Sequence, residues 1–361
     1  RRAFGGGDFG RGRGNRADGR RAERGVELSR QRHGVYTLTV ALETSTLAER
    51  LGRRMEAVER RLGEEVRLDD LQVDPATTHL VGAGGKRLRP ALVLLAAELG
   101  PRPGAEAVLD SAVAVELTHL ASLYHDDVMD DAPMRRGVPS VQSLFGNSVA
   151  ILAGDVLFAR ASLVTSKLGP QAVKLHATTF ERLCQGQLHE TIGPRASVLE
   201  DKTGSLIATS ARYGVLFSGG SWELADALAQ YGECIGVAFQ LADDVIDIES
   251  DGAVTGKTPG TDLREGVDTM PTLLLRELGE KGALDAEGAA ILDLLDNADL
   301  SGDEALADVV ARLRGHSVLE ETREMAQDWV SRAIESIRFL PEGEIREELV
   351  RFARLTVDRS A

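Results

Sequence analysis

SAVAVELTHLASLYHDDVMDD, residues 111–131, is an apolar segment that runs directly into a cluster of aspartates. GVAFQLADDVID, residues 236–247, repeats this arrangement far downstream. Each segment is apolar around most of its circumference, which is typical of a helix buried inside a bundle. The sequence therefore predicts two core helices that each end in a D-D-x-x-D cluster.

The rest of the chain also shows helical periodicity. Apolar residues recur at spacings of three and four from Leu47 to Leu62, which predicts an amphipathic helix. Aromatic residues make up only 4% of the chain, which suits helices better than sheets. We predict further helices over 72–82, 90–99, 104–130, 140–167, 170–191, 203–218, 222–248, 269–279, 286–296, 303–313, 317–338 and 343–358. The predicted fold class is all-α, a single helical bundle.

The beginning of the chain differs in composition from the rest. Residues 1–33 hold ten arginines and four acidic residues among many glycines, without apolar periodicity. This composition predicts disorder, so we divide the chain into a basic Gly/Arg-rich extension, residues 1–42, and one domain, residues 43–361. An RNA-binding arm is a second interpretation of the extension. The whole chain carries a net charge of −15, which argues against a nucleic-acid partner.

Two features bear on the compartment. Cys184 and Cys234 lie far apart without the spacing of a disulfide framework or a zinc site, which agrees with a reducing environment. No apolar run approaches the roughly 20 residues that a membrane helix needs. We therefore expect a cytoplasmic protein without a stable membrane span.

The acidic clusters favour a metal ion. Residues i and i+4 of a helix share a face, so Asp126 projects with Asp130, and Asp243 with Asp247. Stacked carboxylates beside an apolar core are costly unless a cation compensates them. Carboxylates without nearby cysteines favour Mg²⁺, which is usually held together with substrate phosphates. One such cluster is commonly only a solvated helix face, but two copies at the ends of apolar helices predict a magnesium site and a phosphorylated substrate.

Basic residues beside these clusters could bind the phosphates. The first group follows the pair Gly84-Gly85, and glycine lets the backbone approach a phosphate closely. Arginine can bind phosphate oxygens in a bidentate fork. In chain order these residues are Lys86, Arg87, Arg89, Arg135, Arg136, Lys202 and Lys257.

Taken together, the motifs resemble those of the trans-isoprenyl (polyprenyl) diphosphate synthase family, of the long-chain type. The matching motifs are G-G-K-R-x-R-P at 84–90, H-x-x-S-L-x-H-D-D-x-x-D at 119–130, R-R-G at 135–137, K-T at 202–203, F-Q-x-x-D-D-x-x-D at 239–247 and G-K at 256–257. The resemblance runs from about residue 45 to the C-terminus. It implies an all-α bundle around a deep central cavity, assembly as a homodimer, and a Mg²⁺-dependent condensation of isopentenyl diphosphate with an allylic diphosphate primer.

The resemblance also implies roles for the matched residues. It assigns metal binding, with up to three Mg²⁺ ions when substrate is bound, to Asp126, Asp127, Asp130, Asp243, Asp244 and Asp247. It assigns catalysis to Lys202, Thr203, Gln240 and Lys257, and contact with the allylic diphosphate to the two lysines together with Arg135. It assigns binding of isopentenyl diphosphate to Lys86, Arg89, His119 and Arg136, and places Arg87 among the substrate-binding residues. The implied reaction is ionisation of the allylic diphosphate, attack by the double bond of isopentenyl diphosphate, and loss of a proton to the released diphosphate.

Ala121 and Ser122 bear on the length of the product. They precede Asp126 by five and four residues, about one helical turn. Short-chain members of the family tend to carry a large aromatic residue at one or both positions. Both residues here are small, so we expect a long-chain all-trans polyprenyl diphosphate. The alternative is that the two side chains simply pack against a neighbouring helix.

Other functions fit the residues less well. A short-chain geranylgeranyl or farnesyl diphosphate synthase would share every motif except the small pair. A class I terpene cyclase shares the first acidic motif but normally has a different second one and lacks the G-G-K-R and R-R-G sites. A non-catalytic subunit usually loses the aspartate clusters, and both are intact here. An interaction protein with acidic helices explains neither the glycine–cation motif nor the buried placement.

Overall fold

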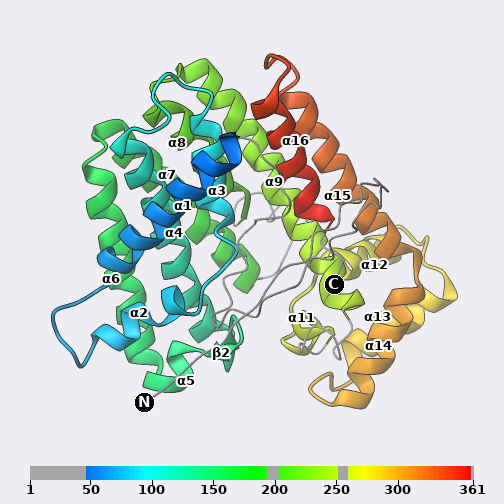
Figure 1. The fold of residues 1–361 in the computed structure, drawn as a ribbon. Coiled ribbons are helices and arrows are strands. Elements are labelled where there is room, and N and C mark those ends of the chain that lie inside the picture. The colour runs from blue at the N-terminus through cyan, green and yellow to red at the C-terminus, as the bar shows by residue number, and fades with distance from the viewer. Residues whose placement is uncertain (1–45, 193–202, 251–258, 359–361) are drawn as a thin grey trace, which may run out of the picture. The chain divides into compact units, whose positions relative to one another are not determined.

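The computed structural model describes residues 46–192, 203–250 and 259–358, all within one compact unit, Val35–Ala361. These residues are almost entirely helical, which confirms the predicted fold class (Figure 1). The helices are α1 (Thr46–Glu65), α2 (Asp74–Gly82), α3 (Leu88–Ala97), α4 (Glu106–Met129), α5 (Val141–Phe145), α6 (Asn147–Ser166), α7 (Pro170–Ile192), α8 (Ser205–Phe217), α9 (Trp222–Glu249), α11 (Thr261–Arg264), α12 (Met270–Glu280), α13 (Ala286–Asn297), α14 (Asp303–Gly315), α15 (Ser317–Ser336) and α16 (Glu344–Val357). The predicted extension, residues 1–42, lies outside the described residues.

Two helices, α4 and α9, form the centre of the bundle. α4 packs along α6 and also contacts α3 and α8, while α9 lies between α8 and α15. Their apolar side chains are buried, including Leu117 and Leu120 on α4 and Ile235 and Leu241 on α9. The two predicted core helices are therefore present, and each carries its aspartates to its C-terminal end.

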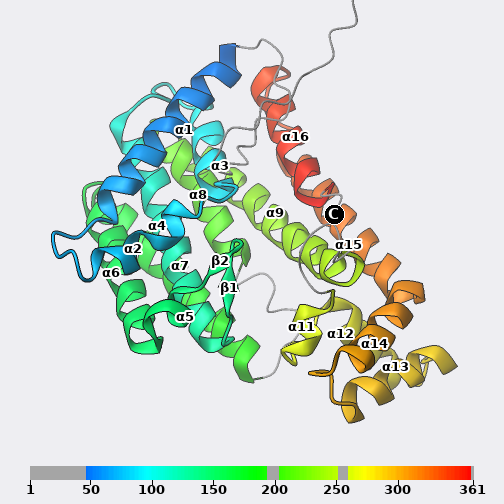
Figure 2. The same ribbon diagram turned by 60° about the horizontal axis from the view of Figure 1, so that its bottom comes forward.

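The acidic end of α9 is surrounded by the shorter C-terminal helices. α11 to α14 gather there, away from α1 (Figure 2). They share an apolar cluster with α9, in which Val245 and Ile248 meet Leu275 of α12 and Val309 of α14. This packing fixes the second aspartate cluster against the C-terminal part of the bundle.

α8 and α9 cross closely because glycine lies at the contact. A Cβ atom added to Gly236 would lie 2.4 Å from Cα of Gly204, and one added to Gly232 would lie 2.7 Å from Cα of Ala208. Both separations are too short for carbon atoms, so the crossing requires residues without side chains. It sets the direction in which α9 leaves α8 and runs toward its acidic end.

The segment after the first acidic cluster differs from the prediction. The helix predicted over 140–167 is interrupted at Gly146, where φ is 83°, so α5 and α6 are separate helices. A small antiparallel hairpin, β1 (Met134–Arg135) and β2 (Val138–Pro139), precedes them. Its turn residues, Arg136 and Gly137, have φ values of 54° and 76°. Tight hairpin turns favour such positive values, although Arg-Gly is a weaker sequence signal than Asn-Gly.

α6 is the one described helix that is long and apolar enough to cross a membrane by length and composition. The expectation that no apolar segment comes near this length was therefore wrong. This is weak evidence for a membrane span, because core helices of water-soluble proteins pass the same test. In α6, 39% of the apolar window is buried inside the bundle.

Candidate functional site

A pocket of about 260 Å³ brings together five of the residues predicted to bind substrate, including the four assigned to isopentenyl diphosphate. They come from the loop before α3, from α3 and α4, and from the β1–β2 hairpin. These five residues are Lys86, Arg87, Arg89, His119 and Arg136; the pocket is completed by Leu88, Glu116, Phe239, Leu355, Thr356 and Asp358. The structure therefore gathers the cations of three separate motifs around one cavity, and their roles as ligands stay predictions.

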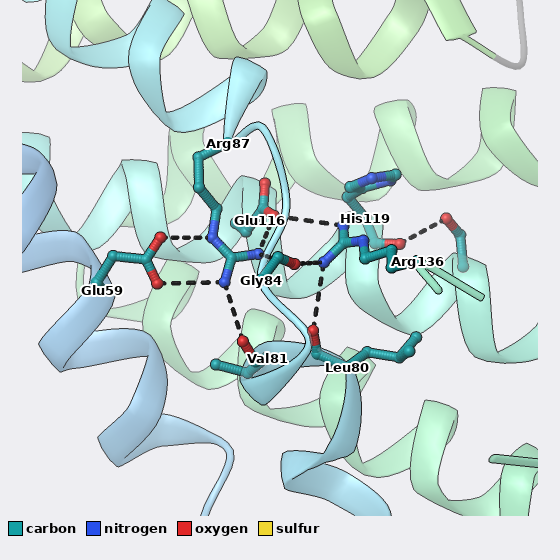
Figure 3. Close-up of polar contacts among 9 residues, drawn as sticks. Glu59, Leu80, Val81, Gly84, Arg87, Glu116, His119 and Arg136 are labelled. Carbon is teal, nitrogen blue, oxygen red and sulfur yellow. Dashed lines mark hydrogen bonds and ion pairs between the residues drawn. The ribbon is translucent and has the colours of Figure 1, made fainter. Parts of the chain in front are cut away.

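All three guanidinium nitrogens of Arg87 are hydrogen-bonded within the protein (Figure 3). Its Nε lies 2.7 Å from Oε1 of Glu59, and its Nη1 lies 2.9 Å from Oε1 of Glu116. The remaining donor contacts reach the second oxygen of Glu59 and the carbonyls of Gly84 and Val81. A buried guanidinium with all three nitrogens engaged stabilises the loop that carries it, and the expectation that Arg87 also binds the substrate stays a prediction.

Arg136 holds the same loop from the opposite side. Its Nη1 donates to the carbonyl of Leu80 at 3.3 Å and also to the carbonyl of Gly84 (Figure 3). Arg136 and Arg87 therefore both bind the carbonyl of Gly84. Together with Asp131, they are the only non-glycine residues with positive φ in the described part of the chain. Such conformations cost free energy and tend to occur at functional sites.

Burial disfavours the charged forms of Arg89 and His119 in the absence of a ligand. Burial, with a smaller contribution from Arg136, lowers the pKa of Arg89 to about 10, and its Nε is buried without a hydrogen-bond partner among the described residues. Burial and the nearby Arg89 and Arg136 hold the pKa of His119 well below its usual value. The pocket thus holds cationic arginines and a neutral imidazole, and an anionic group would relieve the strain on both.

The first acidic cluster lies at the end of α4. Asp126 is half-buried and Asp130 is exposed, whereas Asp127 is buried. Nε of Arg135 donates to Oδ1 of Asp127 at 2.5 Å, while Oδ2 of Asp127 is buried and has no partner within the described ranges. Burial raises the pKa of Asp127, and Arg135 opposes this effect. The hairpin therefore connects this cluster, through Arg135, with the pocket, through Arg136.

The second cluster contains one exposed and one buried aspartate side by side. Asp243 is exposed, whereas Asp244 is buried and accepts from Nε2 of Gln240 at 3.1 Å and from the backbone N–H of Met270 at 2.9 Å. The Oγ1 atom of Thr203 donates to Gln240 at 3.0 Å. Burial, reinforced by Asp243 and Asp247, raises the pKa of Asp244 to about 7. Asp244 thus connects α9 with the start of α12 and orients Gln240.

Asp247 and Glu265 bring the two clusters into one electrostatic environment. The carboxylate of Asp247 accepts from the backbone N–H groups of Thr261, at 3.2 Å, and Asp262, at 3.3 Å. Burial raises the pKa of Glu265, and the charges of both Asp130 and Asp247 raise it further. Glu265 is therefore within electrostatic reach of both clusters.

The carboxylates near these clusters fit a hard divalent cation. Burial, followed by the charges of Asp247 and Asp244, raises the pKa of Asp262, which reflects negative charge that the neighbouring protein groups do not compensate. Over the described residues, no three Asp, Glu, His or Cys side chains are already arranged as a closed metal cage. An open arrangement of this kind suits Mg²⁺, which takes part of its coordination from water and substrate phosphates.

Two predicted site residues cannot be placed. Lys202 and Lys257 lie outside the described residues, so their contact with the allylic diphosphate stays a prediction. Thr203, the partner of Lys202 in the K-T motif, is described and lies against Gln240 as noted above. Thr203 is therefore the residue of the K-T motif whose contacts the structure describes.

The two small residues before the first cluster occupy different environments. Ala121 is fully buried and belongs to the apolar core shared by α4 and α6. Ser122 is half-buried, and its hydroxyl donates to the carbonyl of His119. Ser122 therefore has more space around it than Ala121. The alternative in which the small side chain packs against neighbouring helices describes Ala121.

Sequence reasoning missed two acidic residues of the site. Glu116 lies in the pocket wall, and the pKa of Glu265 responds to the charge of both aspartate clusters. A signal for Glu116 was present, because it is a charge within the apolar stretch 111–124 and precedes His119 by one helical turn. Glu265 offered no comparable signal, since acidic residues are common near it.

A model of the polyprenyl synthetase family matches residues 71–298. Its span includes both aspartate clusters and all the cations of the pocket, and the class of protein defined by this fold and site is a helical prenyltransferase that acts on diphosphates. A nonaprenyl diphosphate synthase from Mycobacterium tuberculosis is 40% identical over 312 residues, which cover 84% of this chain and 91% of that protein. The chain belongs to the polyprenyl synthetase family.

Solved structures agree with this assignment. The crystal structure of geranylgeranyl pyrophosphate synthase from Corynebacterium glutamicum, complexed with calcium and isoprenyl diphosphate, is 39% identical with a TM-score of 0.77 and covers 89% of this chain and 99% of that one. The polyprenyl synthase from Caulobacter crescentus, also complexed with calcium and isoprenyl diphosphate, is 28% identical with a TM-score of 0.79, covering 87% and 97%. The similarity thus extends over the whole helical domain.

Proposed function

We propose that the protein is a Mg²⁺-dependent synthase that condenses isopentenyl diphosphate with an allylic diphosphate primer into a long-chain all-trans polyprenyl diphosphate. The observation that carries the proposal is the pocket of cations, which the hairpin residues Arg136 and Arg135 connect with the first aspartate cluster, while Glu265 is within electrostatic reach of both clusters. A cation-lined pocket suits one diphosphate, and clustered carboxylates suit a second diphosphate bound through divalent metal.

Up to three Mg²⁺ ions are proposed to be held with the allylic diphosphate by Asp126 and Asp130 of α4 and Asp243 and Asp247 of α9. When bound, the ions supply the positive charge that stabilises the departing diphosphate. Asp127 and Asp244 have their carboxylates committed to Arg135 and to Met270 and Gln240. We therefore assign these two residues to positioning the metal-binding aspartates.

The pocket residues orient isopentenyl diphosphate. Lys86, Arg89 and Arg136 bind its diphosphate, and the neutral imidazole of His119 donates one hydrogen bond. Gln240 and Thr203, which are hydrogen-bonded to each other beside Asp244, are proposed to act at the allylic bond that breaks. The double bond of isopentenyl diphosphate attacks the allylic cation, and the released diphosphate takes the proton that is lost. Lys202 and Lys257 are proposed to neutralise the allylic diphosphate.

The long-chain product is supported by the small residues Ala121 and Ser122 and by the similarity to a nonaprenyl diphosphate synthase. The similarity to a geranylgeranyl synthase of almost equal identity favours a shorter product instead. Ser122 is small and half-buried next to the first aspartates, whereas Ala121 packs in the core. This feature belongs to the chain itself, and we therefore favour the long product.

A homodimer is proposed through α5, α6 and α7. Eight of the fourteen large apolar residues exposed in the described chain lie on these three helices. Exposed apolar surface of this kind marks an interface, and a second copy explains why α6 is apolar without a membrane. A cytoplasmic location is proposed as well, because the exposed thiol of Cys184 is unpaired and free thiols persist in reducing compartments.

One assay tests the proposed activity. The protein is incubated with isopentenyl diphosphate and a C15 allylic primer, with Mg²⁺ or with EDTA, and the products are dephosphorylated and separated by chromatography. We expect long prenyl alcohols only with Mg²⁺. Products that stop at C20 would establish the short-chain alternative, and cyclic hydrocarbons formed from the primer alone would establish a cyclase. Sedimentation of the wild type and of Leu152→Glu tests the dimer, which the variant should weaken.

A further inference from the structure

Glu116 is a buried carboxylate among the cations of the pocket. Its side chain is only 2% exposed, and it contacts Nη1 of Arg87 at 2.9 Å and Nη2 of Arg136 at 4.0 Å (Figure 3). It lies on α4, one turn before His119. No substrate or metal role accounts for it, because an anionic substrate is repelled by a carboxylate and the aspartate clusters lie further along the helix.

The charges around Glu116 are unbalanced in favour of the cations. Arg87, Arg89 and Arg136 all line the same small pocket. Burial lowers the pKa of Arg136, as it does that of Arg89, and in both cases the negative charge of Glu116 opposes the effect. Three guanidinium groups this close repel one another. Glu116 is the buried anion that offsets this repulsion at the centre of the group.

The contacts of Arg87 show how Glu116 affects the substrate loop. Arg87 lies between Lys86 and Arg89 in sequence and has a positive φ of 48°. Its guanidinium is held on the outside by Glu59, whose side chain is 37% exposed, and on the inside by Glu116. The inner contact is shielded from water and therefore constrains the loop more strongly.

We propose that Glu116 is a positioning residue for isopentenyl diphosphate: it holds Arg87 and Arg136, and through them the loop 84–89, in the geometry that receives the diphosphate. This inference rests on the proposed function, because it assumes that the pocket binds isopentenyl diphosphate. It assigns to Glu116 an effect on one substrate and not on the other. It also predicts that the negative charge favours the binding of an anion, by ordering the cations before the substrate arrives.

Glu98 provides a matched control. Like Glu116, it is a shielded carboxylate, 5% exposed, that pairs with two arginines, Arg50 and Arg54, each at 2.8 Å. Neither of these arginines lines the pocket. Glu116→Gln and Glu98→Gln therefore each remove the charge of a shielded carboxylate paired with two arginines, and only Glu116 lies in the proposed substrate pocket. A purely structural role for Glu116 would make the two variants alike.

The experiment measures steady-state kinetics with each substrate varied in turn, together with thermal unfolding. We expect Glu116→Gln to raise the KM for isopentenyl diphosphate by about tenfold, the effect of one charge-assisted contact, with the KM for the primer and kcat nearly unchanged. Glu98→Gln should lower the unfolding temperature without changing either KM. An unchanged or lower KM for isopentenyl diphosphate in Glu116→Gln, or equal changes for both substrates, would overturn the inference.

Two further measurements keep the test decisive. If Glu116→Gln does not fold, Glu116→Asp keeps the charge but retracts it by one methylene, and it should give a smaller rise of the same KM; no rise would overturn the inference. Wild-type turnover of the two diphosphates is measured first. Its absence would mean that the proposed function fails, whereas normal turnover with no selective effect in the variants would mean that only the role of Glu116 fails.

Discussion

Gln240 donates from Nε2 to Oδ1 of Asp244 at 3.1 Å, one turn further along α9, and this bond separates the roles of two adjacent aspartates. Asp244 faces inward and is saturated by Gln240 and the backbone of Met270, while its neighbour Asp243 faces solvent. One D-D pair thus contains a buried residue that is hydrogen-bonded within the protein and an exposed residue that we propose to bind metal. The variants below are chosen to tell the two apart.

The metal assignment is tested by Asp126→Ala and Asp243→Ala. We expect each variant to lose nearly all turnover in Mg²⁺, because a ligand of the ion is missing. The metal-free protein should unfold at the same temperature as the wild type or higher, since a charge leaves a crowded acidic space. Diphosphate release and thermal unfolding in EDTA measure the two effects. Wild-type turnover in either variant would contradict the assignment.

Asp244→Ala should act on stability. It leaves the buried N–H of Met270 without its acceptor, and such a loss costs about 1–3 kcal/mol. Urea unfolding of the metal-free protein gives the change in the free energy of unfolding. Asp243→Ala is the matched control, because the neighbouring side chain is exposed. Equal stabilities of the two variants would show that the bond to Met270 does not hold α12.

Arg89→Ala should weaken the binding of isopentenyl diphosphate selectively. The loss of a charge-assisted contact of about 1.5–3 kcal/mol raises its KM roughly ten- to hundredfold, with a smaller effect on the primer. Kinetics with each substrate varied in turn provide the measurement. Arg60→Ala, an exposed change on α1, should leave both values unaltered. A larger effect on the primer than on isopentenyl diphosphate would reverse the assignment of the two subsites.

His119 should make stability dependent on pH. Its folded pKa lies well below the ordinary value of 6.5, so below that value the unfolded chain binds a proton that the folded chain does not. The free energy of unfolding therefore falls as the pH falls, by at most about 1.4 kcal/mol per pH unit, and by less because the ring borders the pocket. We expect His119→Gln to show a shallower decline in urea unfolding between neutral and mildly acidic pH. Parallel curves would indicate an unperturbed imidazole.

Ser122→Phe should shorten the product. The half-buried position next to the first aspartates has room for a ring, which would obstruct a growing prenyl chain. Ala121→Phe is the informative comparison, because a ring forced into a full core costs about 1–3 kcal/mol of stability. Product chromatography and thermal unfolding separate the two effects. A product of unchanged length from Ser122→Phe would show that the chain grows along a different wall.

The sequence predicted the parts of the fold that depend on local pattern. The buried segments that become α4 and α9 were recognisable because apolar residues surround them, and the aspartates at their ends followed directly. The break at Gly146 was missed because the residues on both sides continue a helical pattern. The hairpin turn at Arg136 was missed because tertiary contacts, to Leu80 and Gly84, hold that arginine in place.

The pocket is a second example of a feature that depends on tertiary contacts and could not be predicted from local sequence pattern. The cations were found from their motifs, yet sequence could not separate Arg87, which binds protein, from Arg89, whose Nε has no protein partner in the described structure. That distinction depends on Glu59 and Glu116, which are 28 and 29 residues away from Arg87. The packing of α1 and α4 against the loop engages the guanidinium of Arg87, whereas Nε of Arg89 has no protein partner in the described structure.

Because α8 and α9 cross closely at Gly236, a change at this residue would tilt the whole C-terminal part of α9. Asp243 lies seven residues after Gly236, about 10 Å along the helix axis, and Asp247 lies a further turn away. A methyl group at Gly236 would push the helices apart and tilt α9. The displacement would grow with distance from the crossing. The aspartates at the far end would therefore move most, so the geometry of the acidic site depends on the close approach of Gly236 to Gly204.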